Sequence, residues 1–292
     1  MTLAFLPSPS SGVLHLGPIP LRGYAFCILL GVLVAVVMGN RRFVARGGQP
    51  GAVADVAVVA VPFGLVGARL YHCITSPAAY LDDPVRILYI WQGGLGIPGG
   101  ILGGVLAGLV VCRRRGIAPG AFADAIAPGV VIAQAIGRFG NYVNQELFGR
   151  PTTLPWGLRI DPDNRPAEYA GVATFHPTFL YEALWNVGVA LIVIWADRRF
   201  QLSRGRAFAL YLALYAVGRA WIEALRVDEA TTFFGVRLND YVMAVVFAGA
   251  VAYLVARRDA PREQVVQRGP DDEPAGPSGE APDPGADVAS RA

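Results

Sequence analysis

Long apolar segments recur through residues 1–258 and constrain the fold of this chain more than any other feature of its sequence. A helix needs about 20 mainly apolar residues to cross a bilayer. Only 16% of the residues are charged, whereas an average soluble domain carries about 25%, so an ordinary cytosolic enzyme is disfavoured. The sequence predicts an all-α integral membrane protein, a polytopic bundle of about seven transmembrane helices. The expected helices are Ile19–Gly39, Val53–Tyr71, Leu95–Cys112, Phe122–Ile136, Pro177–Trp195, Ala207–Leu225 and Tyr241–Ala256.

Basic residues between the expected helices indicate the orientation of the bundle. The chain has 25 arginines and no lysine, and many arginines follow the first, third, fifth and seventh segments. The loop after the second segment instead has Asp82, Asp83 and one arginine, Arg86. Cytoplasmic loops carry an excess of basic residues, so we expect the N-terminus outside and the C-terminus in the cytoplasm. This expectation depends on Arg41, Arg42, Arg46, Arg113, Arg114, Arg115, Arg198, Arg199, Arg204, Arg206, Arg257, Arg258 and Arg262.

A change of composition divides the chain after residue 258. Residues 259–292 hold 8 acidic residues and 3 arginines, are rich in Pro and Gly, and contain almost no large apolar residues. Such a composition cannot bury a core. We therefore expect residues 1–258 to form one membrane-embedded domain and residues 259–292 to be a disordered, acidic cytoplasmic tail.

Charged side chains inside or beside a membrane span are costly and mark function by default. One such cluster, Gly137–Pro151, follows the fourth segment and opens a loop of about 40 residues, a length that is usually functional. A second cluster is Arg219, Glu223 and Arg226, whose spacing places them on one helical face. A third is Arg69, near the outer end of the second segment.

Guanidinium groups at headgroup depth would suit a phosphate ligand, because arginine binds phosphate through paired hydrogen bonds. Two simpler interpretations stay open. The cluster in the sixth segment could be an intrahelical ion pair that stabilises the bundle. The cluster after the fourth segment could be a loop of Asn and Gly turns with snorkelling arginines.

The glycine-rich segment Gly93–Gly108 superficially resembles a phosphate-binding loop, but it lacks the lysine and the preceding strand of a nucleotide site. Its glycines recur at intervals of four, the small-residue pattern of closely packed membrane helices. We therefore favour helix packing for this segment. Gly93–Pro98 could still interrupt the helix and line a polar cavity.

Cysteine and histidine are rare in this chain. Cys27, Cys73 and Cys112 form no C-x-x-C pair, which excludes a disulfide framework or a zinc site as the organising principle. We expect three small buried side chains rather than a catalytic thiol. His176 opens the fifth segment and is followed by a polar cluster, which gives it more weight than the other histidines.

These motifs together resemble the signature of bacterial prolipoprotein diacylglyceryl transferases. Motif order and the seven-span topology agree from about residue 17 to the seventh segment. The motifs that carry the resemblance are Gly137–Pro151, Leu154–Gly157, His176–Glu182, Gly93–Gly104 and Arg219-x-x-x-Glu223-x-x-Arg226, with Tyr24 at the start of the first segment.

The resemblance implies an enzyme of the bacterial plasma membrane whose active site faces the extracytoplasmic side. Such an enzyme transfers a diacylglyceryl group from phosphatidylglycerol to the lipobox cysteine thiol of a prolipoprotein. It forms a thioether and releases sn-glycerol 1-phosphate, the first step of lipoprotein maturation. No metal, cofactor or nucleic acid is expected. The implied catalytic residues are Arg138, Arg219, Glu146 and Glu223, and the implied substrate-binding residues are Arg138, Asn141, Gly149, Tyr24, Asn144, His176 and Arg226.

The resemblance also reveals a departure at Pro98. Many family members have a histidine there, proposed as the base that deprotonates the thiol. The proton acceptor therefore stays unassigned in this chain, with His176 and Glu146 as candidates.

A different class of protein remains as the alternative. A transporter or flippase for an anionic solute or lipid would have Arg69, Arg138 and Arg219 lining a pathway. Transporters tend to show internal repeats and polar groups near the midplane, whereas this sequence shows neither. A phosphatidyltransferase of the CDP-alcohol kind would need an aspartate-rich metal motif, and the pair Asp82-Asp83 does not provide one.

Overall fold

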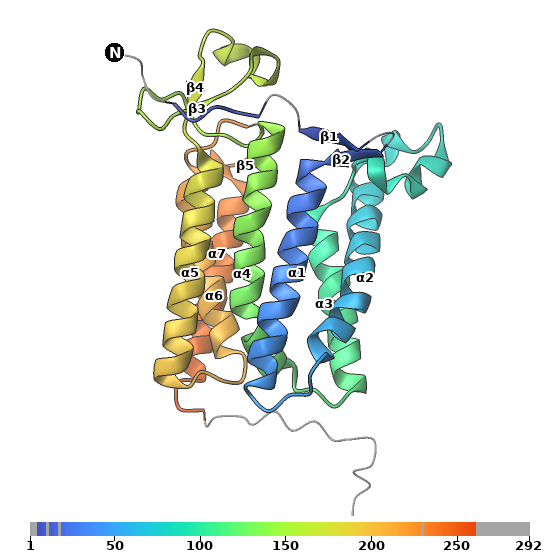
Figure 1. Cartoon of the computed structure of the whole chain (residues 1–292), viewed down its shortest axis with the longest axis vertical. Coiled ribbons are helices and arrows are strands. Elements are labelled where there is room, and N and C mark those ends of the chain that lie inside the picture. The colour runs from blue at the N-terminus through green and yellow to red at the C-terminus, as the bar shows by residue number, and fades with distance from the viewer. Residues whose placement is uncertain (1–4, 10–11, 17–18, 229–230, 261–292) are drawn as a thin grey trace, which may run out of the picture.

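The computed structural model of the chain describes residues 5–9, 12–16, 19–228 and 231–260. Seven α-helices in this part of the chain form one bundle (Figure 1), which confirms the all-α fold. Six of them are long and apolar enough to cross a membrane. The other, α6, carries Arg206, Arg219 and Glu223 within its 18 residues. The helices are α1 (Gly23–Val44), α2 (Ala52–Thr75), α3 (Ile97–Arg114), α4 (Pro119–Asn144), α5 (Thr178–Phe200), α6 (Arg206–Glu223) and α7 (Leu238–Ala256).

Short strands and 3-10 helices fill the connections at one end of the bundle, the upper end in Figure 1. The strands form three antiparallel pairs, β1 with β2, β3 with β4 and β5 with β6. Their bounds are β1 (Val13–Leu16), β2 (Ile19–Arg22), β3 (Leu158–Arg159), β4 (Thr174–Phe175), β5 (Thr232–Phe233) and β6 (Val236–Arg237). The 3-10 helices are η1 (Pro77–Ala79), η2 (Pro84–Leu88), η3 (Ile90–Gln92), η4 (Pro162–Asn164) and η5 (Ala167–Tyr169).

Most of the expected helix ends differ from the observed ends by a few residues, and two of the differences affect the polar end of the bundle. The first helix begins at Gly23, because residues 19–22 form strand β2 instead. The fourth helix continues to Asn144, eight residues beyond its expected end at Ile136. Hydropathy falls where the polar residues begin, but the helix continues through them. Arg138 and Asn141 therefore lie on the last turns of α4. The loop that follows therefore starts at residue 145, and it contains β3, β4 and a small apolar core around Phe175.

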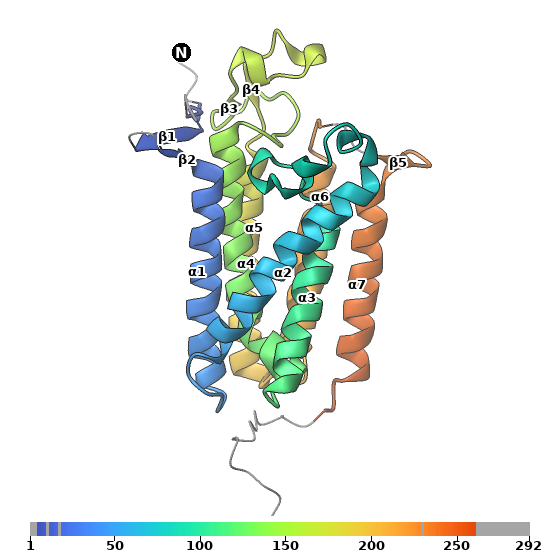
Figure 2. The ribbon, with the colours of Figure 1, turned by 90° about the vertical axis from the view of Figure 1, so that its right-hand side faces the viewer.

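Helix α4 holds the bundle together, since it packs against α1, α5 and α6, while α2 and α3 pack mainly against each other (Figures 1 and 2). Glycines permit the close approach of α2 and α3. A β-carbon on Gly103 would lie 2.5 Å from the carbonyl oxygen of Phe63, and one on Gly67 would lie 3.2 Å from the Cα of Gly103. Helix packing by the glycine-rich segment, as the sequence predicted, is confirmed.

Arg69, on α2, has a structural role that the sequence did not indicate. Its side chain is buried, and all of its guanidinium N–H groups point at backbone carbonyls of the segment between α2 and α3. Nε donates to Ile87 at 2.8 Å, and Nη1 donates to Gly93 at 2.6 Å and Gly94 at 3.0 Å. The guanidinium also lies 5.0 Å from the centre of the Tyr80 ring. Arg69 therefore fixes this segment and has no donor left for a solute.

The substitution Arg69→Met should destabilise the protein strongly. It leaves several carbonyl oxygens without their donor, at about 1 kcal/mol or more for each hydrogen bond that water cannot replace. We expect the melting temperature in detergent to fall by several degrees. Arg86→Met is the matched control, because the Arg86 side chain is exposed. Equal melting temperatures for the two variants would contradict this role.

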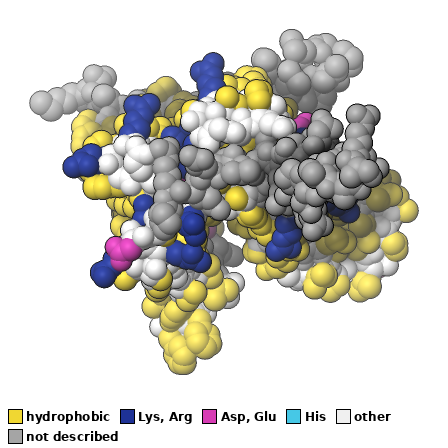
Figure 3. All heavy atoms as spheres, turned by 90° about the horizontal axis from the view of Figure 1, so that it is seen from below, with side chains coloured by type: hydrophobic (Ala, Val, Ile, Leu, Met, Phe, Trp, Pro, Cys, Tyr) yellow, Lys and Arg dark blue, Asp and Glu magenta, His cyan; other side chains and the backbone are white. Residues whose placement is uncertain are grey.

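The opposite end of the bundle, where the described part of the chain ends, is rich in arginine (Figure 3). Asp197 at the end of α5 accepts hydrogen bonds from Arg42 at 2.8 Å and Arg46 at 2.7 Å. Asp124 is fully buried and accepts the backbone N–H of Gly205 at 2.8 Å and of Phe208 at 3.0 Å. The Asp124 contacts cap the first turn of α6 and fix it to α4, whereas Asp197 ties the end of α5 to the end of α1.

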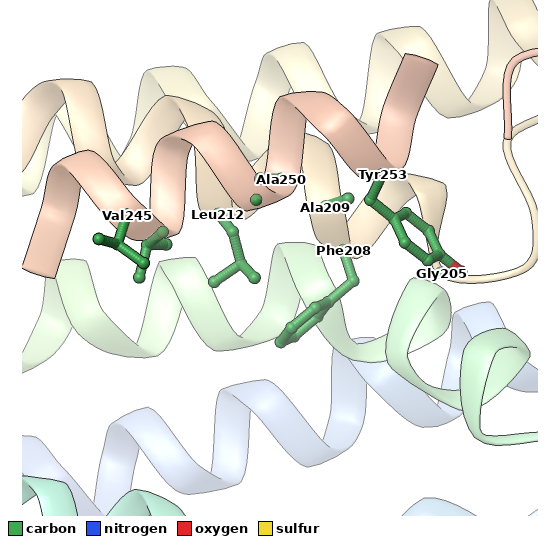
Figure 4. A pocket seen from close by; sticks show the side chains of 9 residues that line it. Gly205, Phe208, Ala209, Leu212, Val245, Ala250 and Tyr253 are labelled. Carbon is green, nitrogen blue, oxygen red and sulfur yellow. The ribbon is translucent and has the colours of Figure 1, made fainter. Parts of the chain in front are cut away.

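A shallow apolar groove of about 430 Å³ lies between α6 and α7 near this arginine-rich end (Figure 4). It is far along α6 from Arg219 and Glu223, which lie in the last two turns of the helix. The groove therefore takes no part in the polar clusters. Its lining residues are Gly205, Phe208, Ala209, Leu212, Val245, Val246, Gly249, Ala250 and Tyr253.

Two further expectations concern the cysteines and the tail. Cys112 is buried, as expected, but Cys27 and Cys73 are partly exposed on the outside of the bundle, and all three thiols are free. Residues 261–292, which form nearly all of the expected tail, lie outside the described residues.

Candidate functional site

The centre of the candidate site is Glu182, a buried carboxylate in the second turn of α5. One of its oxygens accepts from Arg138 Nε at 3.0 Å, and the other accepts from Arg219 Nη1 at 2.9 Å. Arg138 comes from α4 and Arg219 from α6. Glu182 therefore holds two guanidinium groups from separate helices side by side, at the end of the bundle that carries the strands.

A second carboxylate, Glu223 at the end of α6, extends this cluster. Its oxygens accept from Arg219 at 2.5 Å and from Arg237 at 2.9 Å, and Arg226 lies 3.5 Å away. Asn239 also donates to Glu223, at 3.2 Å. The intrahelical ion pair expected from the spacing is thus present. It is one part of a larger network that also includes a residue from β6 and one from α7.

Asp228 completes the network just beyond α6. Its two oxygens accept a bidentate pair of hydrogen bonds from Arg226, at 2.6 and 2.8 Å. Four arginines and three carboxylates therefore lie in one connected group, which leaves a net charge of +1 for an anion. The members are Arg138, Arg219, Arg226, Arg237, Glu182, Glu223 and Asp228.

Glu146 belongs to a separate branch of the site. Arg138 Nη1 donates to Asn141 at 3.4 Å, and Asn141 in turn donates to Glu146 at 2.8 Å. Asn144 donates to the same carboxylate oxygen of Glu146 at 3.4 Å. Among the described residues Glu146 pairs with no arginine, so Glu182 and Glu223, rather than Glu146, hold the guanidinium groups.

Tyr24 meets this branch from the first turn of α1. Its ring lies against Gly140, where an added β-carbon would be 2.6 Å from Tyr24 Cδ2. Glycine at this position lets the aromatic ring lie directly over the backbone of α4, between Arg138 and Asn141 in sequence. Tyr24 is still 39% exposed, so the residue is only partly covered by α4.

Gly149 joins the loop after α4 to the ends of two other helices. Its N–H donates to the carbonyl of His176 at 2.9 Å, and it forms an antiparallel bridge with Arg226. An added β-carbon would meet His176 Cβ at 2.8 Å and the Leu225 carbonyl at 3.2 Å. The glycine therefore permits close contact between the loop and the end of α6.

The substitution Gly149→Ala should lower the stability of the site, because backbone atoms cannot move aside cheaply. We expect a cost of about 1–3 kcal/mol, as for other overpacked positions, and a lower melting temperature. Gly171→Ala is the matched control, since nothing lies within 4 Å of a β-carbon at Gly171. A Gly149→Ala variant as stable as the control would disprove the contact.

His176 precedes α5 and makes a local contact. Its Nδ1 lies 3.2 Å from the hydroxyl of Tyr181, which also accepts from Trp156 at 3.0 Å. Burial lowers the pKa of His176 below its usual value of 6.5, because desolvation disfavours the charged ring. The lowered pKa favours the neutral imidazole, which is the form that can accept a proton.

A polar hollow of about 400 Å³ opens beside Glu146. Five of its nine lining residues carry amide or carboxylate side chains, and they come from the end of α4 and the residues just after it, from η4 and from the segment after α6. It therefore offers hydrogen-bonding groups next to the arginine cluster. Its lining residues are Asn144, Gln145, Glu146, Leu147, Phe148, Asn164, Pro166, Val227 and Asp228.

Four residues of this network had no expected role from the sequence, namely Glu182, Arg237, Asp228 and Asn239. Glu182 belongs to the motif His176–Glu182, but nothing in its spacing linked it to Arg138 or Arg219. Arg237 follows Glu223 by 14 residues across a hairpin, and no helical periodicity spans that distance. For Glu182 the usable signal was its position, since an acidic residue one turn inside an apolar segment calls for a basic partner.

Comparison with known proteins gives a consistent result. Residues 11–256 match the family model described as prolipoprotein diacylglyceryl transferase. Phosphatidylglycerol–prolipoprotein diacylglyceryl transferase 2 of Streptomyces coelicolor is 64% identical over 87% of this chain and 81% of its own length. Transferase 1 of that organism is 57% identical over 97% and 83%, respectively. The corresponding protein of Rhodococcus jostii is 48% identical over 96% and 82%.

Proposed function

The chain belongs to the prolipoprotein diacylglyceryl transferase family, and from this premise we propose that the Arg138–Glu182–Arg219 cluster binds the phosphate of phosphatidylglycerol. The protein is a transferase of lipoprotein biosynthesis. The single observation that carries the site assignment is the bridge made by Glu182, which holds two arginines from separate helices beside each other.

The reaction moves the diacylglyceryl group to a cysteine thiol of the prolipoprotein, within its lipobox. The thiol loses its proton, and the thiolate attacks the glycerol carbon next to the phosphate. The carbon–sulfur bond forms as the carbon–oxygen bond breaks, and sn-glycerol 1-phosphate leaves. No nucleophile from the enzyme is needed, because the acceptor provides it.

The arginine cluster supports this step electrostatically. The phosphodiester carries one negative charge, whereas the departing glycerol phosphate takes up a second as the bond breaks. Fixed guanidinium donors near that charge stabilise the transition state, by about 3–4 kcal/mol per donor if oxyanion sites are a guide. The same positive charge favours the thiolate, whose thiol has an unperturbed pKa of about 8.5.

The polar hollow beside Glu146 fits the glycerol end of the headgroup. Asn141 links Glu146 to Arg138 through two consecutive hydrogen bonds, so a phosphate on Arg138 would place its glycerol hydroxyls near this hollow. Carboxylate and amide groups can hydrogen-bond those hydroxyls. Glu146 and neutral His176 both remain candidates for the proton acceptor.

We infer the orientation of the site in the membrane from the arginines at the opposite end of the bundle. Connections rich in arginine stay in the cytoplasm. When the arginine-rich end lies on the cytoplasmic side of a bacterial plasma membrane, the Glu182 cluster faces the extracytoplasmic side, at the depth of the lipid headgroups. A secreted prolipoprotein and the outer leaflet would then both reach it.

Product detection tests this assignment directly. Purified protein in vesicles receives a lipobox peptide with phosphatidylglycerol, with phosphatidylethanol or with neither. The thioether peptide is measured by mass and the released phosphate ester separately. Phosphatidylethanol keeps the phosphodiester charge but lacks the glycerol hydroxyls, so we expect slower transfer from it. Lipid movement without a modified peptide would favour a transporter instead, although the buried donors of Arg69 argue against that function.

Pro98 provides a further prediction. It occupies the first turn of α3, where its missing N–H has no helical partner to lose, and its side chain is exposed. We expect Pro98→Ala to transfer the diacylglyceryl group at the wild-type rate, measured in the same assay. A large loss would show that this position shapes the reaction through the backbone before α3.

A further inference from the structure

An exposed aromatic tip on the β5–β6 hairpin is not explained by the transfer reaction. Phe233 is 59% exposed and Phe234 is 87% exposed, and their rings lie 4.4 Å apart. Phe234 has a φ of +48°, followed by Gly235 at +78°. Asn or Asp is usual at the first position of such a turn. A phenylalanine at this position therefore indicates that its apolar ring has a function of its own.

The hairpin projects sideways from the bundle rather than upward. Figure 2 shows β5 extending beyond α7, below the level of β3 and β4. Helix α7 is long and apolar enough to span a membrane. Its exposed apolar residues include Leu238, Val242 and Val245, so the aromatic tip continues the lipid-facing surface of this helix.

The base of the hairpin belongs to the arginine network. Arg237 on β6 pairs with Glu223 at 2.9 Å and donates to the carbonyls of Arg226 at 3.1 Å and Asp228 at 2.8 Å. The hydroxyl of Tyr241 on α7 donates to the carbonyl of Phe233 at 3.1 Å. Only Gly235 and Val236 separate Phe234 at the tip from Arg237 in the network, so one short hydrogen-bonded hairpin joins the two.

We propose that Phe233 and Phe234 insert into the headgroup interface of the outer leaflet, and that this anchor positions Arg237 on Glu223. Phenylalanine, like tryptophan and leucine, buries its apolar side chain at the boundary between headgroups and acyl chains, and the continuity of the tip with α7 identifies the bilayer as its partner. The anchor itself is independent of the reaction, whereas the positioning role of Arg237 rests on the proposed function.

Spin labelling tests the anchor without any substrate. Phe234→Cys is made in a background in which Cys27, Cys73 and Cys112 are alanine and transfer is retained. The labelled protein is placed in phosphatidylcholine vesicles. Collision rates with oxygen and with a water-soluble nickel chelate then report the depth of the label. Val245→Cys, in mid-α7, and Gly171→Cys, in the loop between α4 and α5, provide the hydrocarbon and aqueous controls.

We expect the label at position 234 to lie between the two controls, at interfacial depth. A label as accessible to the nickel chelate as that at position 171 would overturn the anchor. A label that is aqueous alone but shielded by a lipobox peptide would also overturn it, because the tip would then bind polypeptide rather than lipid.

Activity tests the positioning role. The double variant Phe233→Ser, Phe234→Ser should lower kcat on the order of tenfold in vesicles, equal to about 1.4 kcal/mol, with little change in KM for the lipid. The variant Phe233→Trp, Phe234→Trp should restore the rate, since tryptophan also prefers the interface. Wild-type kcat in the serine variant, or failure of the tryptophan variant to restore the rate, would overturn the positioning role. The depth of the label tests the anchor independently of these kinetic results.

Discussion

Arg138→Ala should abolish most diacylglyceryl transfer while the protein stays inserted and folded. The variant removes one of the two guanidinium groups that Glu182 holds together, and with it a donor for the departing phosphate. A loss of about 3–4 kcal/mol of transition-state stabilisation corresponds to a rate lowered by roughly 10²–10³. The thioether product, measured by mass in vesicles that contain phosphatidylglycerol, gives the rate.

Arg113→Ala is the control for Arg138→Ala. Arg113 is an exposed arginine at the far end of α3, away from the cluster. It should transfer at the wild-type rate, so a general effect of lost positive charge would be recognised. Wild-type transfer by the Arg138→Ala variant would remove this residue from the mechanism.

Glu182→Gln should slow catalysis while phosphatidylglycerol binding is retained or tightened. Glutamine has the same shape, but its amide would direct an N–H group at one of the two arginines, donor against donor. The net charge of the cluster would rise from +1 to +2, which favours an anion. We expect kcat to fall by about 10- to 100-fold, since two charge-assisted hydrogen bonds are disturbed, and KM to stay level or decrease.

The comparison for Glu182→Gln is Glu168→Gln, an exposed carboxylate on η5 that makes the same chemical change outside the cluster. Both kinetic parameters should be normal in that variant. A Glu182→Gln enzyme with unchanged kcat but a raised KM would mean that the carboxylate serves lipid binding rather than the alignment of the arginines.

The sequence predicted the helices well but their ends poorly. Apolar windows located all seven helices of the described chain. The window for the fourth helix stopped at Ile136, although the helix continues to Asn144. Hydropathy measures transfer into lipid, and it cannot recognise a helix whose last turns face a polar cluster within the protein.

The roles of the arginines show the same limit. Arg69, Arg138 and Arg219 looked alike in sequence, as charges close to the same end of the bundle. In the structure Arg69 donates to the backbone of its own neighbouring segment, whereas Arg138 and Arg219 share one carboxylate. Only the positions of the carbonyl oxygens distinguish a structural arginine from one that can hold an anion.

By itself, the sequence determined the class of the protein and located the seven helices of its described part, and it singled out Arg138 and Arg219 as candidates for binding a phosphate. Hydrophobicity and charge belong to the residues themselves, so the sequence shows which segments favour a membrane without any knowledge of the tertiary structure. The tertiary structure decided which charges meet. It brought Glu182 between Arg138 and Arg219, and Arg237 onto Glu223, because an ion pair depends on distances of a few ångströms between helices far apart in the chain.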